Sequence, residues 1–227
     1  MNAYLQALTD LDFLSAEALE SQPALLQAIS QTTCQPGEAL FHDNDESDCL
    51  YLVASGLVKM MTQLPNGRTR IVRLHRRGAL LGLNALLEKA HDHTAIAIDE
   101  VEVYLLPLAE IMQWKETQPE LYTHLMEKWY DYLNYADTWI TDFSTGSVKG
   151  RVARLINFLA CFDEATGPKV VELLTTDEMA EILGVTPESV SRVVAELKRE
   201  NILRAIENNV ESLFTFDKDS LQELAQG

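Results

Sequence analysis

Residues 175–203 of the chain read TTDEMAEILGVTPESVSRVVAELKRENIL, the pattern of two short helices joined by a tight turn. Thr175 and Glu178 have capping-box spacing, in which each side chain bonds the other residue's backbone N–H at a helix start. Gly184 supplies the permissive backbone that a turn between two helices needs, and Thr186 can cap the second helix. The stretch therefore predicts a helix-turn-helix motif.

The second predicted helix, residues 187–200, separates an apolar face from an opposite face whose side chains suit base edges. An arginine such as Arg192 can donate two hydrogen bonds to guanine, and a carboxylate such as Glu188 can accept one from cytosine. The alternative is an interaction helix with ordinary solvated charges, but the two matched caps and the ordered Ala, Gly and Val spacing favour DNA binding. The predicted DNA contacts are Thr186, Pro187, Glu188, Ser189, Ser191, Arg192 and Arg199, together with Lys149 from the preceding segment.

Two short strand patterns follow the motif. Residues 202–206 and 210–216 are rich in apolar and β-branched side chains, and Glu207–Asn209 between them contains asparagines that tolerate left-handed backbone. Asp217 can cap a last helix over 218–225, and a further helix is expected over 148–162. Residues 147–227 are therefore predicted to form a winged helix-turn-helix domain.

The segment Glu188-Ser189-Val190-Ser191-Arg192 resembles the E-x-x-S-R recognition helix of the Crp/Fnr superfamily of bacterial transcription regulators. The resemblance extends from about residue 26 to residue 216. Motifs in the order and spacing of that family's cyclic-nucleotide-binding β-roll are Pro36-Gly37-Glu38, 50–53, 55–59, Asn66-Gly67 and 78–82. Asn44 stands where the family has a glycine, and asparagine is the usual substitute in left-handed backbone.

The resemblance implies an α+β fold in three parts. These are a β-roll sensor domain with an N-terminal helical segment in 1–118, a dimerisation helix and hinge in 119–146, and the winged helix in 147–227. It also implies a cytoplasmic homodimeric activator that binds palindromic DNA with TTGA-like half-sites and has RNA polymerase as a partner. The residues alone leave the effector and the sign of regulation open.

A heptad pattern follows Pro119 and predicts one long helix with a seam for a second copy of the chain. Leu125, Tyr132 and Trp139 widen the apolar face, so the helix is also expected to touch the β-roll. A core helix within a single domain is the alternative. The predicted dimer contacts are Tyr122, Met126, Trp129, Leu133, Ala136, Ile140 and Phe143.

The predicted effector pocket departs from the family's cyclic-AMP-binding members, which carry G-E-[LI]-[AG]-L before R-[ST]-A. Leu83 stands in place of the acid that holds the ribose hydroxyl, and His93 in place of the arginine that pairs with the cyclic phosphate. We therefore expect an effector other than cyclic AMP. The expected pocket consists of Leu83, Asn84, Ala85, His93, Thr94, Ala136 and Asp137.

Cofactor chemistry is left open by the sequence. No cysteine precedes Cys34, and the chain has 3 cysteines, fewer than the roughly four thiolates that an iron–sulfur cluster takes. A haem- or metal-dependent gas or redox sensor of the same fold, and a cyclic-nucleotide-responsive regulator, are the alternatives, although histidines in a polar loop are more often solvated than ligating. Candidate ligands are His91, His93, His42, His75 and the thiols of Cys34, Cys49 and Cys161.

The formal net charge of −17 argues against non-specific attraction to nucleic acid. The acid is concentrated in residues 1–146, with 9 Lys and Arg against 21 Asp and Glu, whereas residues 147–204 hold 8 against 9. We therefore expect specificity to depend on base contacts and a dimer. No protease, hydrolase or P-loop motif indicates an enzyme, no apolar run predicts a membrane span, and no cysteine spacing predicts a metal site.

Overall fold

The computed structural model describes residues 3–162, 170–206 and 212–226. By its internal contacts the chain forms two compact units, one of Met1–Gln63 with Val72–Asn134 and one of Leu64–Ile71 with Tyr135–Gly227. This division falls inside the long helix α6, Pro119–Ser144, whereas the sequence suggested boundaries at the two ends of that helix.

The first unit begins with three short helices, α1 (Ala3–Asp10), α2 (Ala16–Glu20) and α3 (Pro23–Ala28). The Ser15 side chain caps α2 by accepting a hydrogen bond of 3.2 Å from the Ala18 backbone N–H. Leu8, Leu19 and Leu25 from the three helices are buried in one core with the strands that follow. The N-terminal helices are thus held on the strands by apolar burial.

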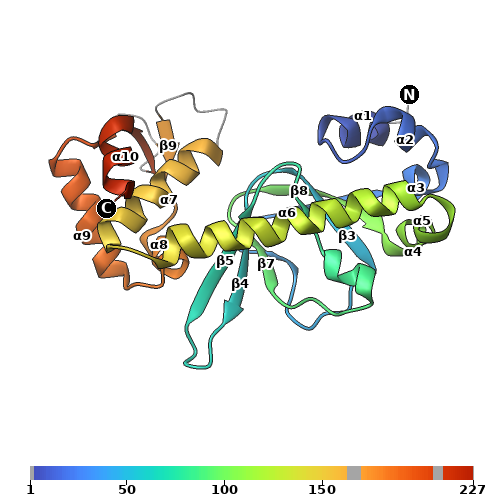
Figure 1. The fold of residues 1–227 in the computed structure, drawn as a ribbon, viewed down its shortest axis with the longest axis horizontal. Helices are drawn as coiled ribbons and strands as arrows, with labels where there is room; N and C mark the ends of the chain where they lie inside the picture. Colours follow the sequence, from blue (N-terminus) through green and yellow to red (C-terminus); the bar gives the residue numbers. More distant parts are fainter. Residues whose placement is uncertain (1–2, 163–169, 207–211, 227) are drawn as a thin grey trace. The chain divides into compact units, whose positions relative to one another are not determined.

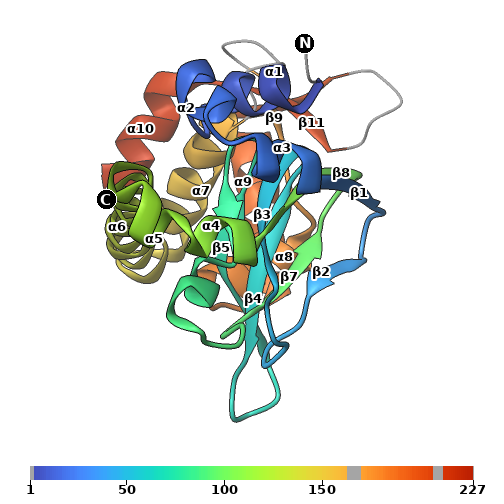
Figure 2. The same cartoon turned by 90° about the vertical axis from the view of Figure 1, so that its right-hand side faces the viewer.

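Two four-stranded sheets, with strand orders β1-β8-β3-β6 and β2-β7-β4-β5, form the body of this unit, although the first residues of β5, Thr69–Ile71, belong to the second unit by their contacts. Figure 2 shows β1 and β8 side by side, as their pairing requires. The strands are β1 (Ser30–Cys34), β2 (Ala39–Phe41), β3 (Cys49–Ser55), β4 (Val58–Gln63), β5 (Thr69–His75), β6 (Leu80–Leu81), β7 (Thr94–Ala97) and β8 (Val101–Pro107), with the short helix η1 (Leu83–Leu87) after β6.

Two residues noted in the sequence, Gly67 of the Asn66-Gly67 motif and Asn44, both adopt left-handed backbone. Gly67, between β4 and β5, has φ of 78°, and its N–H donates to the Leu64 carbonyl over 2.9 Å. Asn44 has φ of 68°, the left-handed conformation expected of the residue that replaces a glycine.

Helices α4 (Leu108–Met112) and α5 (Trp114–Thr117) lead into α6, whose first half packs on the sheets. Leu121 and Leu125 are buried in the core, and the Tyr132 hydroxyl accepts a 2.7 Å hydrogen bond from the Leu80 N–H. The prediction that one face of this helix contacts the β-roll is therefore confirmed for Leu125 and Tyr132, whereas Trp139 packs on Phe143 and Phe158.

The second unit is built on α7, Val148–Phe162, whose bounds match the prediction. Figure 1 shows it gathered with α8 (Thr176–Leu183), α9 (Pro187–Arg199) and α10 (Lys218–Gln226). A three-stranded sheet has the order β10-β11-β9 and consists of β9 (Val170–Glu172), β10 (Leu203–Ala205) and β11 (Leu213–Phe216). The two predicted strands are present but shorter, β9 was not predicted, and the predicted turn Glu207–Asn209 lies outside the described residues.

Candidate functional site

The helix-turn-helix is assembled as the sequence predicted. The Thr175 hydroxyl accepts from the Glu178 N–H at 3.3 Å while the Glu178 carboxylate accepts from the Thr175 N–H at 3.2 Å, which completes the capping box. Gly184 ends α8 with φ of 64°, a conformation that costs glycine least. Ala180 on α8 and Val190 on α9 are both buried. These contacts fix how α9 is presented.

Helix α9 buries one side and exposes the other. Val190, Val193 and Leu197 are buried. Among the described residues, no hydrogen bond or ion pair engages the Arg192 guanidinium, so all its donors can turn outward. The exposed positions of the helix are Glu188, Ser191, Arg192, Ala195, Lys198 and Arg199.

The first turn of α9 is polar and locally hydrogen-bonded. Thr186 occupies the N-cap, but its hydroxyl pairs with the Ser189 hydroxyl at 3.1 Å and makes no cap bond to a backbone N–H. The Glu188 backbone N–H and the Thr186 side chain hold the pKa of the Glu188 carboxyl below its usual range. Glu188 is therefore ionised at neutral pH and acts only as a hydrogen-bond acceptor.

Lys149, predicted to contact DNA, lies on α7 and reaches two carboxylates near the end of α9. Its ammonium is 2.7 Å from a Glu196 oxygen and 3.2 Å from a Glu200 oxygen. Glu196 raises the pKa of Lys149, and Lys149 lowers the pKa of Glu196. A phosphate would have to compete with both acids for this ammonium, so the contact mainly links α7 to α9.

The wing is tied to the recognition helix by a cation–π contact. The Lys198 ammonium lies 4.4 Å from the centre of the Phe214 ring on β11. Arg204 on the neighbouring strand β10 is exposed, and its Nε donates to the Asn201 carbonyl at 3.2 Å. Sequence reasoning assigned no role to this arginine.

The predicted effector residues of the first unit lie around η1 and β7, and several of their polar atoms already have partners within the chain. The Asn84 amide donates to the Lys89 and Ala90 carbonyls, and the Thr94 hydroxyl accepts from the Asp43 N–H at 3.1 Å. The His93 Nδ1 is 2.8 Å from an Asp92 oxygen. Leu83 and Ala85 are buried, Ala136 is half-buried and Asp137 is exposed.

The predicted dimer residues differ in exposure along α6. Leu133 and Ile140 are 57% and 59% exposed, and Tyr130, which was not in the predicted set, is 63% exposed. Tyr122, Met126 and Trp129 are partly buried against the core of their own unit, and Ala136 is half-buried. Phe143 is 1% exposed because it packs on Trp139 and Phe158 of its own chain.

The histidines and cysteines do not gather. Within the described residues, no group of three or more His, Cys, Asp or Glu side chains is placed to hold a metal ion. Burial, with a smaller contribution from the Arg73 charge, lowers the pKa of His75 to about 3, and its Nε2 is 3.1 Å from the Met60 sulfur. His75 is thus a neutral core residue. Cys34 and Cys49 are buried and Cys161 is exposed.

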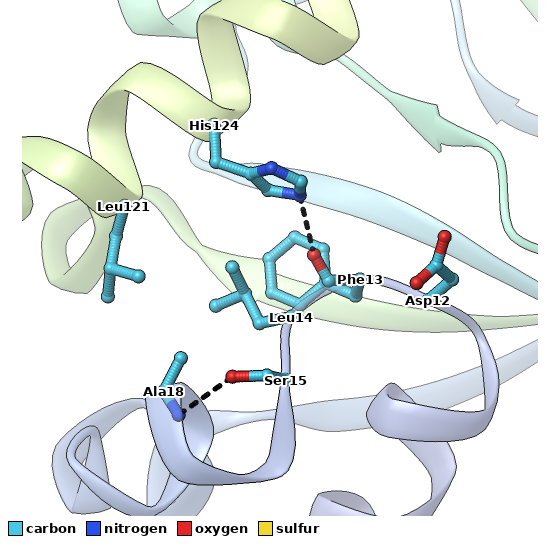
Figure 3. A pocket seen from close by; sticks show the side chains of 7 residues that line it. All are labelled: Asp12, Phe13, Leu14, Ser15, Ala18, Leu121 and His124. Carbon is cyan, nitrogen blue, oxygen red and sulfur yellow. Dashed lines mark hydrogen bonds between the residues drawn. The ribbon is translucent and has the colours of Figure 1, made fainter.

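A surface pocket of about 260 Å³ lies in the first unit and shares no residue with the predicted effector pocket. Figure 3 shows the His124 ring of α6 turned toward the backbone between α1 and α2, where its Nε2–H donates to the Phe13 carbonyl at 3.1 Å. The pocket is lined by Asp12, Phe13, Leu14, Ser15, Ala18, Leu121 and His124. No motif of the sequence indicates it, because its walls are about 110 residues apart in the chain.

Two family models match separate parts of the chain. A cyclic nucleotide-binding domain matches residues 31–118, and a Crp-like helix-turn-helix domain matches residues 150–224. The α+β fold class expected from the sequence is confirmed by these matches and by the observed sheets and helices. Of the described part of the chain, no helix is both long and apolar enough to cross a membrane.

Transcription regulators are similar to this chain over most of its length. The transcriptional activator protein FnrL of Cereibacter sphaeroides is 28% identical over 177 residues, which cover 74% of this chain and 70% of the relative. The fumarate and nitrate reduction regulatory protein of Yersinia pestis is 28% identical over 184 residues, covering 77% and 74%. The solved structure of a CRP/FNR-family transcriptional regulator from Thermus thermophilus is 26% identical, with a TM-score of 0.70, and covers 87% of this chain and 99% of its own.

Proposed function

Because the chain belongs to the Crp/Fnr superfamily of transcription regulators, we propose that it is a homodimer that reads a palindromic operator through α9. The exposed face of α9 carries this proposal, since it combines an unengaged guanidinium with an ionised carboxylate while the opposite face is buried. With DNA as its partner, the protein is cytoplasmic. RNA polymerase is the proposed second partner, in the role of an activator.

The proposed contacts divide into two kinds. Arg192 donates to a guanine and Glu188 accepts from a cytosine, while Ser191 is placed to reach either a base or a phosphate. Thr186, Pro187 and Ser189 lie at the N-terminus of α9, where main-chain N–H groups can donate to a DNA phosphate. Arg199, at the other end of the helix, binds another phosphate of the DNA backbone. Lys149 contributes through its salt bridges to Glu196 and Glu200, which hold α9 in place.

Selection of binding sites from random DNA tests this function. We expect palindromes with TTGA-like half-sites whose centres are about one helical turn, 10 to 10.5 base pairs, apart. Two recognition helices related by the dimer's twofold axis must enter successive major grooves on one side of the duplex, which fixes this spacing. Selected sites that are asymmetric, or that lack such half-sites, would contradict the proposal.

The effector proposed for this protein is not cyclic AMP. Leu83 is a buried apolar side chain at the position where a ribose hydroxyl would need an acceptor. His93 lies 2.8 Å from the Asp92 carboxylate, whose negative charge opposes a phosphate at the same place. The nearby Asn84 amide already donates to backbone carbonyls, so it is not free to replace the missing anchors.

Calorimetry with cyclic AMP and cyclic GMP is therefore expected to show no saturable heat at micromolar concentrations. Each lost anchor weakens binding by about 1 to 3 kcal/mol, and two together move a micromolar site toward millimolar. The double variant Leu83→Glu, His93→Arg restores both anchors and is expected to tighten binding measurably. Micromolar binding of either nucleotide by the unaltered protein would overturn this view of the pocket and leave DNA recognition standing.

A further inference from the structure

Arg154, one turn along α7 from Arg151, bonds to the backbone on both sides of the turn between α6 and α7. Arg154 uses all three guanidinium nitrogens on backbone carbonyls. Its Nε donates to the Asp142 carbonyl at 2.7 Å, one Nη to the Ala225 carbonyl at 2.6 Å, and the other Nη to the Thr145 carbonyl. Asp142 and Ala225 are in the last turns of α6 and α10, so two helix ends converge on one cation.

The physical basis of this contact is the helix terminus. The last carbonyls of an α-helix have no partner within the helix and carry partial negative charge, which a cation stabilises. Arg154 is half-buried, so its hydrogen bonds are less screened by water than those of a surface arginine. The planar fork of guanidinium donors also serves three separate acceptors at fixed angles, which a lysine ammonium on a flexible stem does less well.

Gly146 completes the Arg154 joint, the contact of Arg154 with the ends of α6 and α10 and with the turn between α6 and α7. It has φ of 83°, and a Cβ built on it would lie 3.1 Å from an Arg154 Nη. Any larger residue would therefore combine backbone strain with crowding of the guanidinium. This glycine, in the segment that the sequence suggested as a hinge, is closely approached by the Arg154 side chain.

Aromatic packing holds the same joint from the other side of α6. The Trp139 and Phe143 rings are 4.7 Å apart, and Phe143 is 5.5 Å from Phe158 on α7. Trp139 also lies 5.8 Å from Phe158, and all three ring pairs are nearly perpendicular, an edge-to-face geometry that aromatic pairs favour. The end of α6 is thus fixed to α7 by both polar and apolar contacts.

We propose that Arg154 is a positioning residue for operator recognition, which sets the direction in which the end of α6 meets the winged helix. This inference rests on the proposed function, in which α6 joins the two chains of a dimer. In such a dimer, the angle at the Arg154 joint determines the separation and rotation of the two α9 helices. Arg154 thereby determines which half-site spacing the dimer accepts.

The test measures affinity for palindromes with the selected spacing and with one base pair added or removed. One base pair moves a half-site by roughly 3.4 Å and about a tenth of a turn, so the unaltered protein is expected to bind altered spacings at least about tenfold more weakly. Arg154→Met keeps the length of the side chain but removes its donors, and it is expected to reduce that preference to about twofold. Base preference within each half-site should be unchanged.

Two further variants separate positioning from a general loss of stability. Arg151→Met removes a guanidinium from the same helix, but the Arg151 side chain donates to the Leu183 carbonyl at 2.8 Å and so supports α8. Its effect should be an equal loss on all spacings. Arg154→Lys should give an intermediate spacing preference. If thermal unfolding shows that Arg154→Met is not folded, Arg154→Lys replaces it in the measurement.

Retained spacing preference in folded Arg154→Met, or an equal loss at every spacing, would overturn the inference. Failure of the proposed function itself is distinguishable, because the unaltered protein would then select no palindrome at all. Hydrogen exchange gives a readout without DNA: amides at the α6–α7 turn should exchange at least about tenfold faster in Arg154→Met than in Arg151→Met.

Discussion

Arg192→Ala is expected to weaken binding to the selected operator by about 1 to 3 kcal/mol per half-site, or about 2 to 6 kcal/mol for the dimer. That corresponds to roughly a 30-fold to 20,000-fold loss. Bidentate donation to guanine is the reason, because alanine leaves the base edge without a partner and removes discrimination at that position. Since Arg192 is exposed on α9, the folded chain should keep its thermal stability.

Arg199→Ala is the matched control for this loss, because Arg199 is exposed on the same helix and is proposed to contact phosphate. It should weaken specific and random DNA alike and reduce the dependence of log K on log salt by about one unit per protomer. Lys149 is a poorer control, since its removal also leaves Glu196 without its salt bridge. If Arg192→Ala lowers affinity for operator and random DNA equally, Arg192 contacts the DNA backbone and the base contact assigned to it is wrong.

The parts of this molecule that sequence predicts well are those fixed by local chemistry. The capping box joins Thr175 and Glu178, which are three residues apart, so their spacing identifies it. Gly184 adopts a left-handed conformation that glycine favours, so its identity and place in the sequence predict it. The same holds for Asn44 and Gly67 in the sheets. Because α9 alternates buried and exposed positions at the helical period, its exposed face is predictable too.

The features of the structure that could not be predicted depend on contacts between residues that are far apart in the sequence. Lys149 and Glu196 are 47 residues apart, and Arg154 and Ala225 are 71 apart, so no spacing rule connects them. Strand β9 has only 3 residues and is stabilised by pairing with β11, which a short apolar run cannot reveal. Net charge is a weak guide for a different reason, because it averages over the whole chain whereas the proposed recognition depends on the few charges of one helix face.

The apolar heptad positions of helix α6 do not all lie on one surface of the helix with one packing partner. The heptad positions predicted a single seam, yet Met126 packs on the core of the first unit and Phe143 packs on α7. A seven-residue repeat does not distinguish burial within a chain from burial against a second chain. Leu133 and Ile140, seven residues apart and exposed, are the predicted positions that remain free for a partner, with Tyr130 beside them.

The double variant Leu133→Asp, Ile140→Asp is therefore expected to convert the proposed dimer into a monomer. In a dimer joined through this face each carboxylate would be buried without a partner, at a cost on the order of 3 to 5 kcal/mol. Even 3 kcal/mol raises the dissociation constant more than a hundredfold. Analytical ultracentrifugation should show the mass of one 25.5 kDa chain in place of two, and operator affinity should fall with it.

Leu87→Asp is the control for this variant, because Leu87 on η1 is 48% exposed and lies outside α6. It introduces the same change at a comparably exposed leucine, so it should leave both the dimer mass and operator binding unchanged. The double variant should still unfold cooperatively, since Leu133 and Ile140 contribute little to the core of a single chain, but at a lower temperature than the control because it loses the stabilisation that dimerisation supplies. A dimer that persists in the double variant at micromolar concentration would show that the two chains meet elsewhere, and the exposed stripe of α6 would then need another partner.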